Sequence, residues 1–185
     1  MSRIEEAFTR VKRRDFLPRS VQAVAGLDIP LSIGHGQTNS QPTTVRMMLE
    51  WLDPQPGDKV LDVGSGSGWT SALLAHIVGA KGRVYAVELV PQLVTFGRKN
   101  ADKAGIKNAE FFQAGDVFGL PDHAPYDRIL VSASARELPH RLIDQLKVGG
   151  KLVIPVREDV LEITKTAKES YETKTHPGFM FVPLV

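Results

Sequence analysis

The chain has 185 residues, of which 42% are hydrophobic and 24% charged, and it contains no cysteine. A chain of this length can bury roughly 70% of the surface that its unfolded form exposes, so one domain can form without disulfides or metal. The lack of cysteine excludes disulfide frameworks, thiol nucleophiles and cysteine-ligated zinc or iron–sulfur sites. The 23 basic and 21 acidic side chains leave a net charge of +2, which neither requires nor forbids an anionic partner.

Residues 1–16 contain no apolar run of the length that a signal peptide requires, and acidic residues interrupt them. No other stretch approaches the ~20 consecutive apolar residues of a membrane span. We therefore expect a cytoplasmic protein with no membrane partner.

Residues 3–14 suit a short amphipathic helix, because apolar residues recur on one face. These residues are Ile4, Ala7, Phe8 and Val11. The end of the helix is basic, and cations are favoured near a helix C-terminus, so we interpret the charged residues there as a solvated face. They are Arg10, Lys12, Arg13 and Arg14.

Residues 18–42 are punctuated by Gly and Pro and show little periodicity. We expect a long loop, and loops of this size are usually functional or disordered. A helix is expected over residues 43–52, ending before a turn that is rich in proline at residues 53–57.

From residue 59 onward, short apolar strands alternate with helices, which is the pattern of βαβ units and a mostly parallel sheet. The expected strands are 59–63, 83–88, 110–113, 126–132 and 151–156, and the expected helices are 69–78, 91–104 and 138–146.

Two further segments, residues 161–166 and 179–185, are expected to be strands that add an antiparallel edge to the sheet. We therefore predict a single domain over residues 1–185 with a doubly wound α/β architecture. Residues 1–42 would form its N-terminal helix and loop, residues 43–156 its ligand-binding core, and residues 157–185 its C-terminal strands.

The most informative segment is VLDVGSGSG at residues 60–68, where a strand leads into a glycine-rich turn and then a helix. The glycines let the backbone turn tightly and approach a ligand, and the helix N-terminus behind them favours an anion. A dinucleotide motif does not fit, because Trp69 stands where the third glycine is required, and the lysine of a P-loop is absent. Glu88 closes the next expected strand, 20 residues beyond Gly68, where a carboxylate can accept hydrogen bonds from ribose hydroxyls. The pattern predicts a ligand that contains a nucleoside.

Two segments resemble the binding signature of S-adenosylmethionine-dependent methyltransferases, namely DVGSGSG at 62–68 and VYAVE at 84–88. The surrounding segments are similar to those of protein-L-isoaspartate O-methyltransferases. They are GHGQTNSQP at 34–42, APYDRILVSASA at 124–135, QLKVGGKLVIPV at 145–156 and HPGFMFVPLV at 176–185. The resemblance spans nearly the whole chain in the correct order, and it implies a Rossmann-like methyltransferase fold with S-adenosylmethionine as the cofactor.

The resemblance also implies an activity, which is methyl transfer to the α-carboxylate of L-isoaspartyl residues in damaged proteins. The ester would cyclise to a succinimide that can reopen as normal aspartate, so the function would be protein repair. The residue that touches the substrate carboxylate would be Ser40, in a loop that also contains Gln37, Thr38, Asn39, Gln41 and Pro42. The cofactor contacts would be Asp62, Gly64, Ser65, Gly66 and Gly68 on the methionine side, Glu88 at the ribose and Asp116 near the adenine.

This chemistry fits the residue types present. A carboxylate is already ionised at neutral pH, so its attack on a sulfonium methyl group needs no general base. The enzyme must supply placement and shielding from water, and orientation alone can be worth ~7–11 kcal/mol. No metal ligand is expected. The Ser40 hydroxyl could orient the carboxylate, and the alternative interpretation is that Ser40 caps the helix that follows it.

Several residues depart from the family pattern, including Asn39, where a small apolar residue is usual, and Thr43, where an aromatic residue or His is usual. Residues 115–117 read G-D-V where G-D-G is frequent. Because these departures lie on the acceptor side, two alternatives stay open. One is a methyltransferase with the same cofactor that acts on a small molecule or RNA, and the other is a cofactor-binding module without catalysis. No basic stripe interleaved with aromatic residues is visible, so we expect no nucleic-acid partner. We also expect a monomer.

Overall fold

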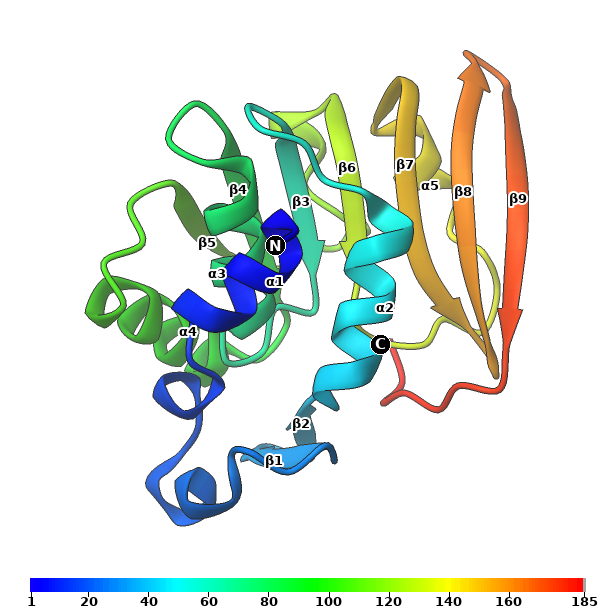
Figure 1. Cartoon of the computed structure of the whole chain (residues 1–185). Helices are drawn as coiled ribbons and strands as arrows, with labels where there is room; N and C mark the ends of the chain where they lie inside the picture. Colours follow the sequence, from blue (N-terminus) through cyan, green and yellow to red (C-terminus); the bar gives the residue numbers. More distant parts are fainter. Residues whose placement is uncertain (185) are drawn as a thin grey trace.

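The computed structural model describes residues 1–184, and its centre is a seven-stranded sheet with the order β5-β4-β3-β6-β7-β8-β9. Neighbouring strands from β5 to β7 are parallel, whereas β8 and β9 add antiparallel pairs at one edge. The strands are β3 (Lys59–Val63), β4 (Arg83–Glu88), β5 (Ala109–Gln113), β6 (Tyr126–Val131), β7 (Leu146–Val156), β8 (Asp159–Ala167) and β9 (Ser170–Pro177). The predicted doubly wound α/β fold with an antiparallel edge is confirmed (Figure 1).

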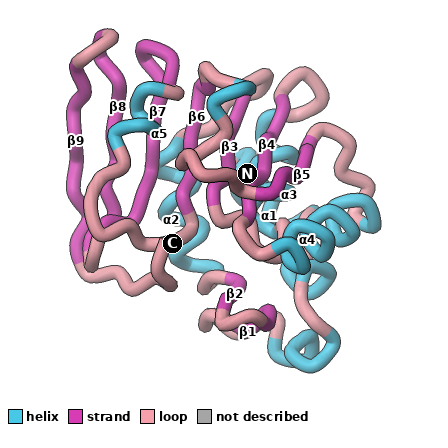
Figure 2. The backbone as a smooth tube through the Cα atoms, turned by 180° about the vertical axis from the view of Figure 1, so that it is seen from behind, coloured by secondary structure: helices cyan, strands magenta, loops and turns pink. Residues whose placement is uncertain are grey.

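Helices cover both faces of the sheet (Figures 1 and 2). One face packs against α1 to α4, and the opposite face packs against α5 and the segment before β6. The helices are α1 (Arg3–Arg10), α2 (Pro42–Leu52), α3 (Trp69–Val78), α4 (Pro91–Lys103) and α5 (His140–Asp144).

The central strands are apolar on both sides, because each of them is covered by both layers. In β3, Val60 is buried against the layer of α1 to α3, and its neighbour Leu61 is buried against the opposite layer. The strands therefore have a continuous apolar sequence because both of their faces are buried.

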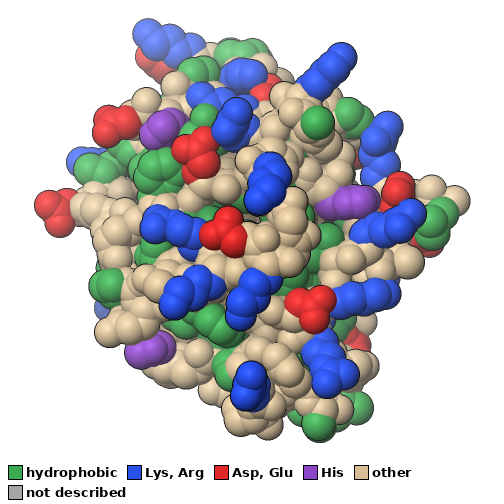
Figure 3. Space-filling view, turned by 90° about the vertical axis from the view of Figure 1, so that its left-hand side faces the viewer, with side chains coloured by type: hydrophobic (Ala, Val, Ile, Leu, Met, Phe, Trp, Pro, Cys, Tyr) green, Lys and Arg blue, Asp and Glu red, His purple; other side chains and the backbone are tan. Residues whose placement is uncertain are grey.

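The surface that faces left in Figure 1 presents Lys and Arg side chains interspersed with acidic ones (Figure 3). Within residues 1–184, no helix has both the length and the apolar character needed to cross a lipid bilayer.

The N-terminal region differs from the expectation. The first helix ends at Arg10 rather than at residue 14, and a 3-10 helix follows at Arg13–Phe16. Arg13 is only 7% exposed, so its assignment to a solvated basic face is wrong.

The long loop expected over residues 18–42 contains regular structure, namely a 3-10 helix at Arg19–Val24 and a hairpin of β1 (Leu31–Gly34) and β2 (Gln37–Asn39). Leu31 and Ile33 are buried on one side of β1, and two alternating residues are too short a pattern to be recognised as a strand.

The C-terminal half contains two further differences. The helix expected at residues 138–146 is the shorter α5, because Leu146 already begins β7. The prediction of a strand at residues 179–185 is wrong for the part that the structure describes, because residues 179–184 make only an isolated bridge at Pro183. Residue 185 lies outside the described residues. The strand that pairs with β8 is β9, which is almost entirely exposed and lacks the apolar alternation on which the prediction relied.

Residues 179–184 instead run from β9 back across the sheet to the loop after β6 (Figure 1). The Ser134 N–H donates to the Val182 carbonyl at 2.8 Å, and the Leu184 N–H donates to the Ser134 carbonyl at 2.8 Å. The last described residues therefore lie at the carboxyl end of the parallel strands.

Candidate functional site

A cavity of about 310 Å³ lies at the carboxyl ends of β3, β4 and β6. The connections from β3 and β6 leave toward opposite sides of the sheet there, which is where open α/β sheets bind ligands. The cavity walls are the turn after β3, the end of β4, the loops after β4, β5 and β6, the β1–β2 hairpin with Ser40, and residues 182–184.

The turn at residues 64–68, here called the cofactor turn, is fixed by backbone hydrogen bonds. The N–H groups of Gly64 and Ser65 donate to the Val87 carbonyl at 2.8 and 3.1 Å. Gly68 has a φ of +82°, and a Cβ there would lie 3.0 Å from the carbonyl oxygen of Gly97 on α4. The last glycine of the turn is thus required for the packing of α3 against α4.

Glu88, at the end of β4, lines the cavity and is 7% exposed. Its Oε2 accepts from the Gly66 N–H at 2.8 Å, and its Oε1 accepts from the Val90 N–H at 2.9 Å. Each carboxylate oxygen has a second acceptor site, so the side chain is held in place while it can still accept from ligand hydroxyls.

Asp62 lies behind the cofactor turn, fully buried and outside the set of residues that line the cavity. Its Oδ2 accepts from the Ser71 hydroxyl at 2.6 Å, whereas its Oδ1 has no partner among the described residues. Burial raises the pKa of Asp62 to about 7, while the Ser71 hydrogen bond lowers it and the charge of Glu88 raises it.

The hydroxyl of Ser65, which does line the cavity, is also buried without a partner among residues 1–184. Buried polar atoms are normally satisfied, so unpartnered atoms beside a cavity fit a polar ligand. A nearby cationic group would also stabilise the ionised form of Asp62. Together with the acceptor Glu88, these atoms fit a cofactor that carries a ribose and a positive charge.

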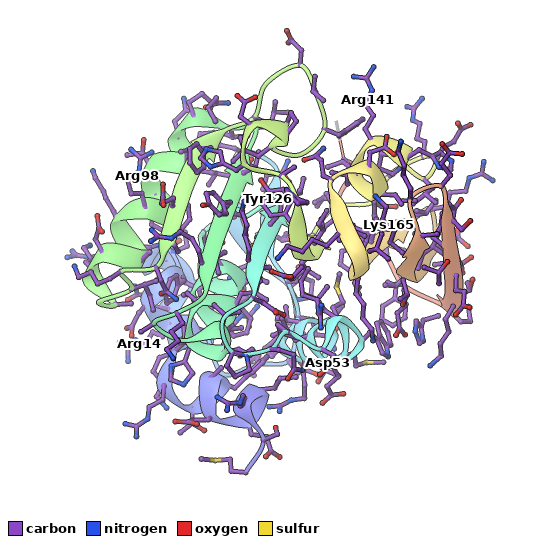
Figure 4. All side chains as sticks on the ribbon, turned by 90° about the horizontal axis from the view of Figure 1, so that it is seen from above. Arg14, Asp53, Arg98, Tyr126, Arg141 and Lys165 are labelled. Carbon is purple, nitrogen blue, oxygen red and sulfur yellow. The ribbon has the colours of Figure 1, made fainter. Side chains whose placement is uncertain are left out.

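Asp116 lies in the loop after β5, where it is exposed and lines the cavity beside Val117 and Phe118. The base of this loop is fixed by two side chains. The Tyr126 hydroxyl, in the middle of the sheet (Figure 4), donates to the Leu120 carbonyl at 2.7 Å, and Gln145 Nε2 donates to the Phe118 carbonyl at 2.8 Å.

Residues 37–42, here called the acceptor loop, are divided by the structure. Gln37, Thr38, Asn39 and Ser40 line the cavity, whereas Gln41 and Pro42 lie outside the cavity wall, where α2 begins.

The alternative role of Ser40 as the cap of α2 is wrong. The residue at the N-cap position is Gln41, and the capping carboxylate comes from Asp28, whose Oδ1 accepts from the Thr43 N–H at 2.8 Å. Hydrogen bonds from Gln41 and Thr43 hold the pKa of Asp28 below its ordinary value.

Three features of the site were missed from the sequence: the cap Asp28, the buried cation Arg13, and the wall at residues 182–184. Asp28 stands 15 positions before the N–H that it caps, so no short motif reveals it. Trp69, which follows the cofactor turn, lines the cavity while its Nε1–H donates to the Val11 carbonyl at 3.3 Å.

Comparisons with known proteins agree with this geometry. The family model for protein-L-isoaspartate(D-aspartate) O-methyltransferase matches residues 1–185. A protein-L-isoaspartate O-methyltransferase from Aeropyrum pernix is 47% identical over 188 residues, which cover 99% of this chain and 72% of the relative. A protein of the same name from Pyrococcus horikoshii is 44% identical over 99% of this chain and 84% of its own length.

Solved structures are similar over the whole chain. A protein-L-isoaspartate O-methyltransferase superposes with a TM-score of 0.92 at 27% identity, and this chain spans 62% of that chain. A Plasmodium falciparum protein described as a putative protein-L-isoaspartate O-methyltransferase, solved with S-adenosyl-L-homocysteine, superposes with a TM-score of 0.89 at 27% identity over 91% of its chain.

Proposed function

The chain belongs to the protein-L-isoaspartate(D-aspartate) O-methyltransferase family, and on that premise we propose that it transfers a methyl group from S-adenosylmethionine to the α-carboxylate of isoaspartyl residues in proteins. The observation that carries the proposal is the shared cavity. Ser40 of the acceptor loop and Glu88 beside the cofactor turn line the same space of about 310 Å³, so donor and acceptor can meet there.

In the proposed reaction, a carboxylate oxygen of the substrate forms a bond to the methyl carbon, and the electrons of the breaking carbon–sulfur bond return to sulfur. The bound cofactor supplies the electrophilic methyl group. No proton is transferred, so the protein needs neither a base nor an acid at the reacting atoms. Its task is to hold the two groups in line and to keep water out.

We assign the individual residues on the same basis. The Ser40 hydroxyl orients the substrate carboxylate, and Gln37, Thr38 and Asn39 form the wall next to it. The contacts proposed for the cofactor that line the cavity are Gly64, Ser65 and Gly66 in the turn, Glu88 at the ribose and Asp116 near the adenine. Asp62 and Gly68, also predicted as contacts, lie outside the cavity wall and would support the turn from behind. Gln41 and Pro42 support the loop from outside the cavity wall.

A pair of peptides that differ in one linkage tests the activity. An isoaspartyl peptide and its aspartyl counterpart are incubated with S-adenosylmethionine labelled in the methyl group, and base-labile methyl ester is counted. We expect label on the isoaspartyl peptide alone. Ser40→Ala should lower kcat/KM by about tenfold or more, because a hydrogen bond to a charged group is lost.

The matched control for Ser40→Ala is Ser32→Ala, a change at an exposed residue of β1 that lies outside the cavity wall. It should leave kcat/KM unchanged. Equal labelling of both peptides, or no label while the cofactor still binds, would contradict the proposed acceptor.

We also propose that the protein acts as a monomer, because one chain supplies every wall of the cavity that residues 1–184 describe. Sedimentation equilibrium tests this point, and a mass near twice 20.3 kDa would contradict it. A cytoplasmic location stays a prediction, to be checked by cell fractionation.

A further inference from the structure

Arg13 is a buried cation that ties three segments of the chain together. It follows α1, and it reaches the stretch before β1 and the acceptor loop. Its Nε donates to the Asn39 side-chain oxygen Oδ1 at 2.7 Å. Its two Nη atoms donate to the backbone carbonyls of Ala25, Leu27, Ile29, Asn39 and Ser40, at 3.3, 2.9, 2.8, 3.2 and 3.1 Å.

Stability alone does not account for this arrangement. The hydrogen-bond acceptors around Arg13 are carbonyl and amide oxygens, and neutral groups only partly replace the hydration that a buried cation loses. Burial lowers the pKa of Arg13, and the charge of Asp28 acts in the opposite direction. An apolar side chain would leave Asn39 Oδ1 and the carbonyls around it without this donor, so what Arg13 contributes is the arrangement of these acceptors.

The Asn39 side chain continues the link toward the cofactor turn. It is 6% exposed, and its Nδ2 donates to the Ser67 hydroxyl at 3.0 Å. Because an arginine can only donate, the amide oxygen must face Arg13, and the amide nitrogen must therefore face Ser67. The chemistry of the neighbours fixes the orientation of this side chain.

Ser67 anchors the other end of the link. It lies within the cofactor turn, lines the cavity and is 2% exposed. Its carbonyl accepts from the Asn100 side chain of α4 at 3.0 Å, so Ser67 is itself held against the helix layer. A continuous set of buried hydrogen bonds thus joins the acceptor loop to the cofactor turn.

We propose that Arg13, acting through Asn39, is a positioning residue that holds Ser40 in register with the cofactor turn. Arg13 bonds the Ser40 backbone carbonyl, so it sets the main chain from which the hydroxyl projects. Asn39 sets the separation of that main chain from Ser67. The inference rests on the proposed function, and it assigns a role to the Asn39 side chain that departs from the family pattern.

Two substitutions of similar size separate positioning from packing. Asn39→Leu keeps the branching at Cγ and the number of side-chain heavy atoms, and it removes both side-chain hydrogen bonds. Asn39→Asp keeps both links, because one oxygen can accept from Arg13 and the other from the Ser67 hydroxyl. Arg13→Lys keeps the charge and loses the planar fork of donors.

For each variant, three quantities are measured on the full chain: kcat and KM for the isoaspartyl peptide, the Kd of S-adenosyl-L-homocysteine, and hydrogen exchange of the amides in residues 26–40. We expect Asn39→Leu and Arg13→Lys to lower kcat/KM by about tenfold or more and to speed exchange in that segment. Asn39→Asp should lower kcat/KM less than Asn39→Leu does, because it keeps both links. The Kd should change by less than about threefold in all three variants.

Two results would overturn the proposal. One is wild-type kcat/KM in Asn39→Leu, and the other is an equal loss in Asn39→Leu and Asn39→Asp. If the wild type labels no isoaspartyl peptide, the proposed function fails by itself, and hydrogen exchange decides the inference. Unchanged exchange of residues 26–40 in Asn39→Leu and Arg13→Lys would then overturn it as well.

Discussion

Glu88 uses both carboxylate oxygens to hold the backbone at Gly66 and Val90. Glu88→Gln keeps the shape and turns an NH2 group toward one of those two N–H donors. We expect the Kd of S-adenosyl-L-homocysteine, measured by calorimetry, to rise by about 10- to 100-fold, because hydrogen bonds to a charged group are lost.

Glu110→Gln is the matched control for Glu88→Gln, since Glu110 lies on β5, is exposed and pairs with Arg83 at 3.0 Å. This control should leave the Kd unchanged. A Kd for Glu88→Gln within threefold of the wild type would contradict the ribose assignment.

Asp62 makes a separate prediction about pH. Its pKa of about 7 lies above the ordinary value near 3.9, so between these values the folded state keeps a proton that the unfolded state has released. The free energy of unfolding therefore falls as the pH rises through this window, and it levels off above about pH 7. Asp62→Asn cannot ionise and should not show this fall.

Urea unfolding at pH 5 and pH 8 checks the sign. From pH 5 to pH 8, the wild type should lose about 2–3 kcal/mol more free energy of unfolding than Asp62→Asn does. No change in the stability difference between the two proteins from pH 5 to pH 8 would mean that Asp62 is already ionised in the folded protein at pH 5.

At the residue scale, the role of a side chain could be predicted when its partners lie at a fixed, short spacing in the sequence. Glu88 could be assigned because it ends a strand at a fixed spacing from the glycine turn, and the structure places it in the cavity wall. Arg13 could not, because its partners stand 12 to 27 positions away and it lies within a basic run that resembles a solvated helix end.

Packing between elements depends on Gly68, where α3 meets α4. Gly68→Ala would place a Cβ 3.0 Å from the Gly97 carbonyl and 3.1 Å from the Phe111 ring, in addition to the strain of φ +82°. We expect a loss of about 2–4 kcal/mol in the free energy of unfolding, measured with urea.

Gly105→Ala separates the cost of backbone strain from the cost of the steric contact. Gly105 has a φ of +74° and nothing within 4 Å of an added Cβ, so only backbone strain of about 1 kcal/mol applies. Equal losses in the two variants would show that the contact between α3 and α4 can relax.

At the element scale, the buried parallel strands could be predicted because burial from both faces leaves a continuous apolar run. The bounds of β3 and β4 agree with the prediction at every residue. β9 could not be predicted, because an exposed edge strand needs no apolar face and its partner is set by the hairpin turn at residues 168–169.

For the whole molecule, the segment that follows β9 links the antiparallel edge to the cavity. Val182, Pro183 and Leu184 line the cavity, whereas Phe179 and Phe181 pack on the core around α2. Removing residues 182–185 should preserve the sheet and lower kcat/KM for the isoaspartyl peptide by about tenfold or more, because the acceptor loses a wall that orients it.

The control for this truncation is Met180→Ala, because Met180 is 97% exposed. It should retain full activity. Circular dichroism and the midpoint of thermal unfolding verify that the truncated chain is folded, and wild-type kcat/KM in that chain would contradict a role for the segment in the site.

The hairpin between β8 and β9 offers a practical use. Its turn, Lys168 and Glu169, is exposed and lies at the end of the sheet opposite the cavity (Figure 1). Since the chain contains no cysteine, a cysteine introduced at Glu169 would be the single thiol for a fluorophore or a surface linker. A protein attached through this turn would present its cavity to the solution, so peptide substrates could be captured or followed one molecule at a time.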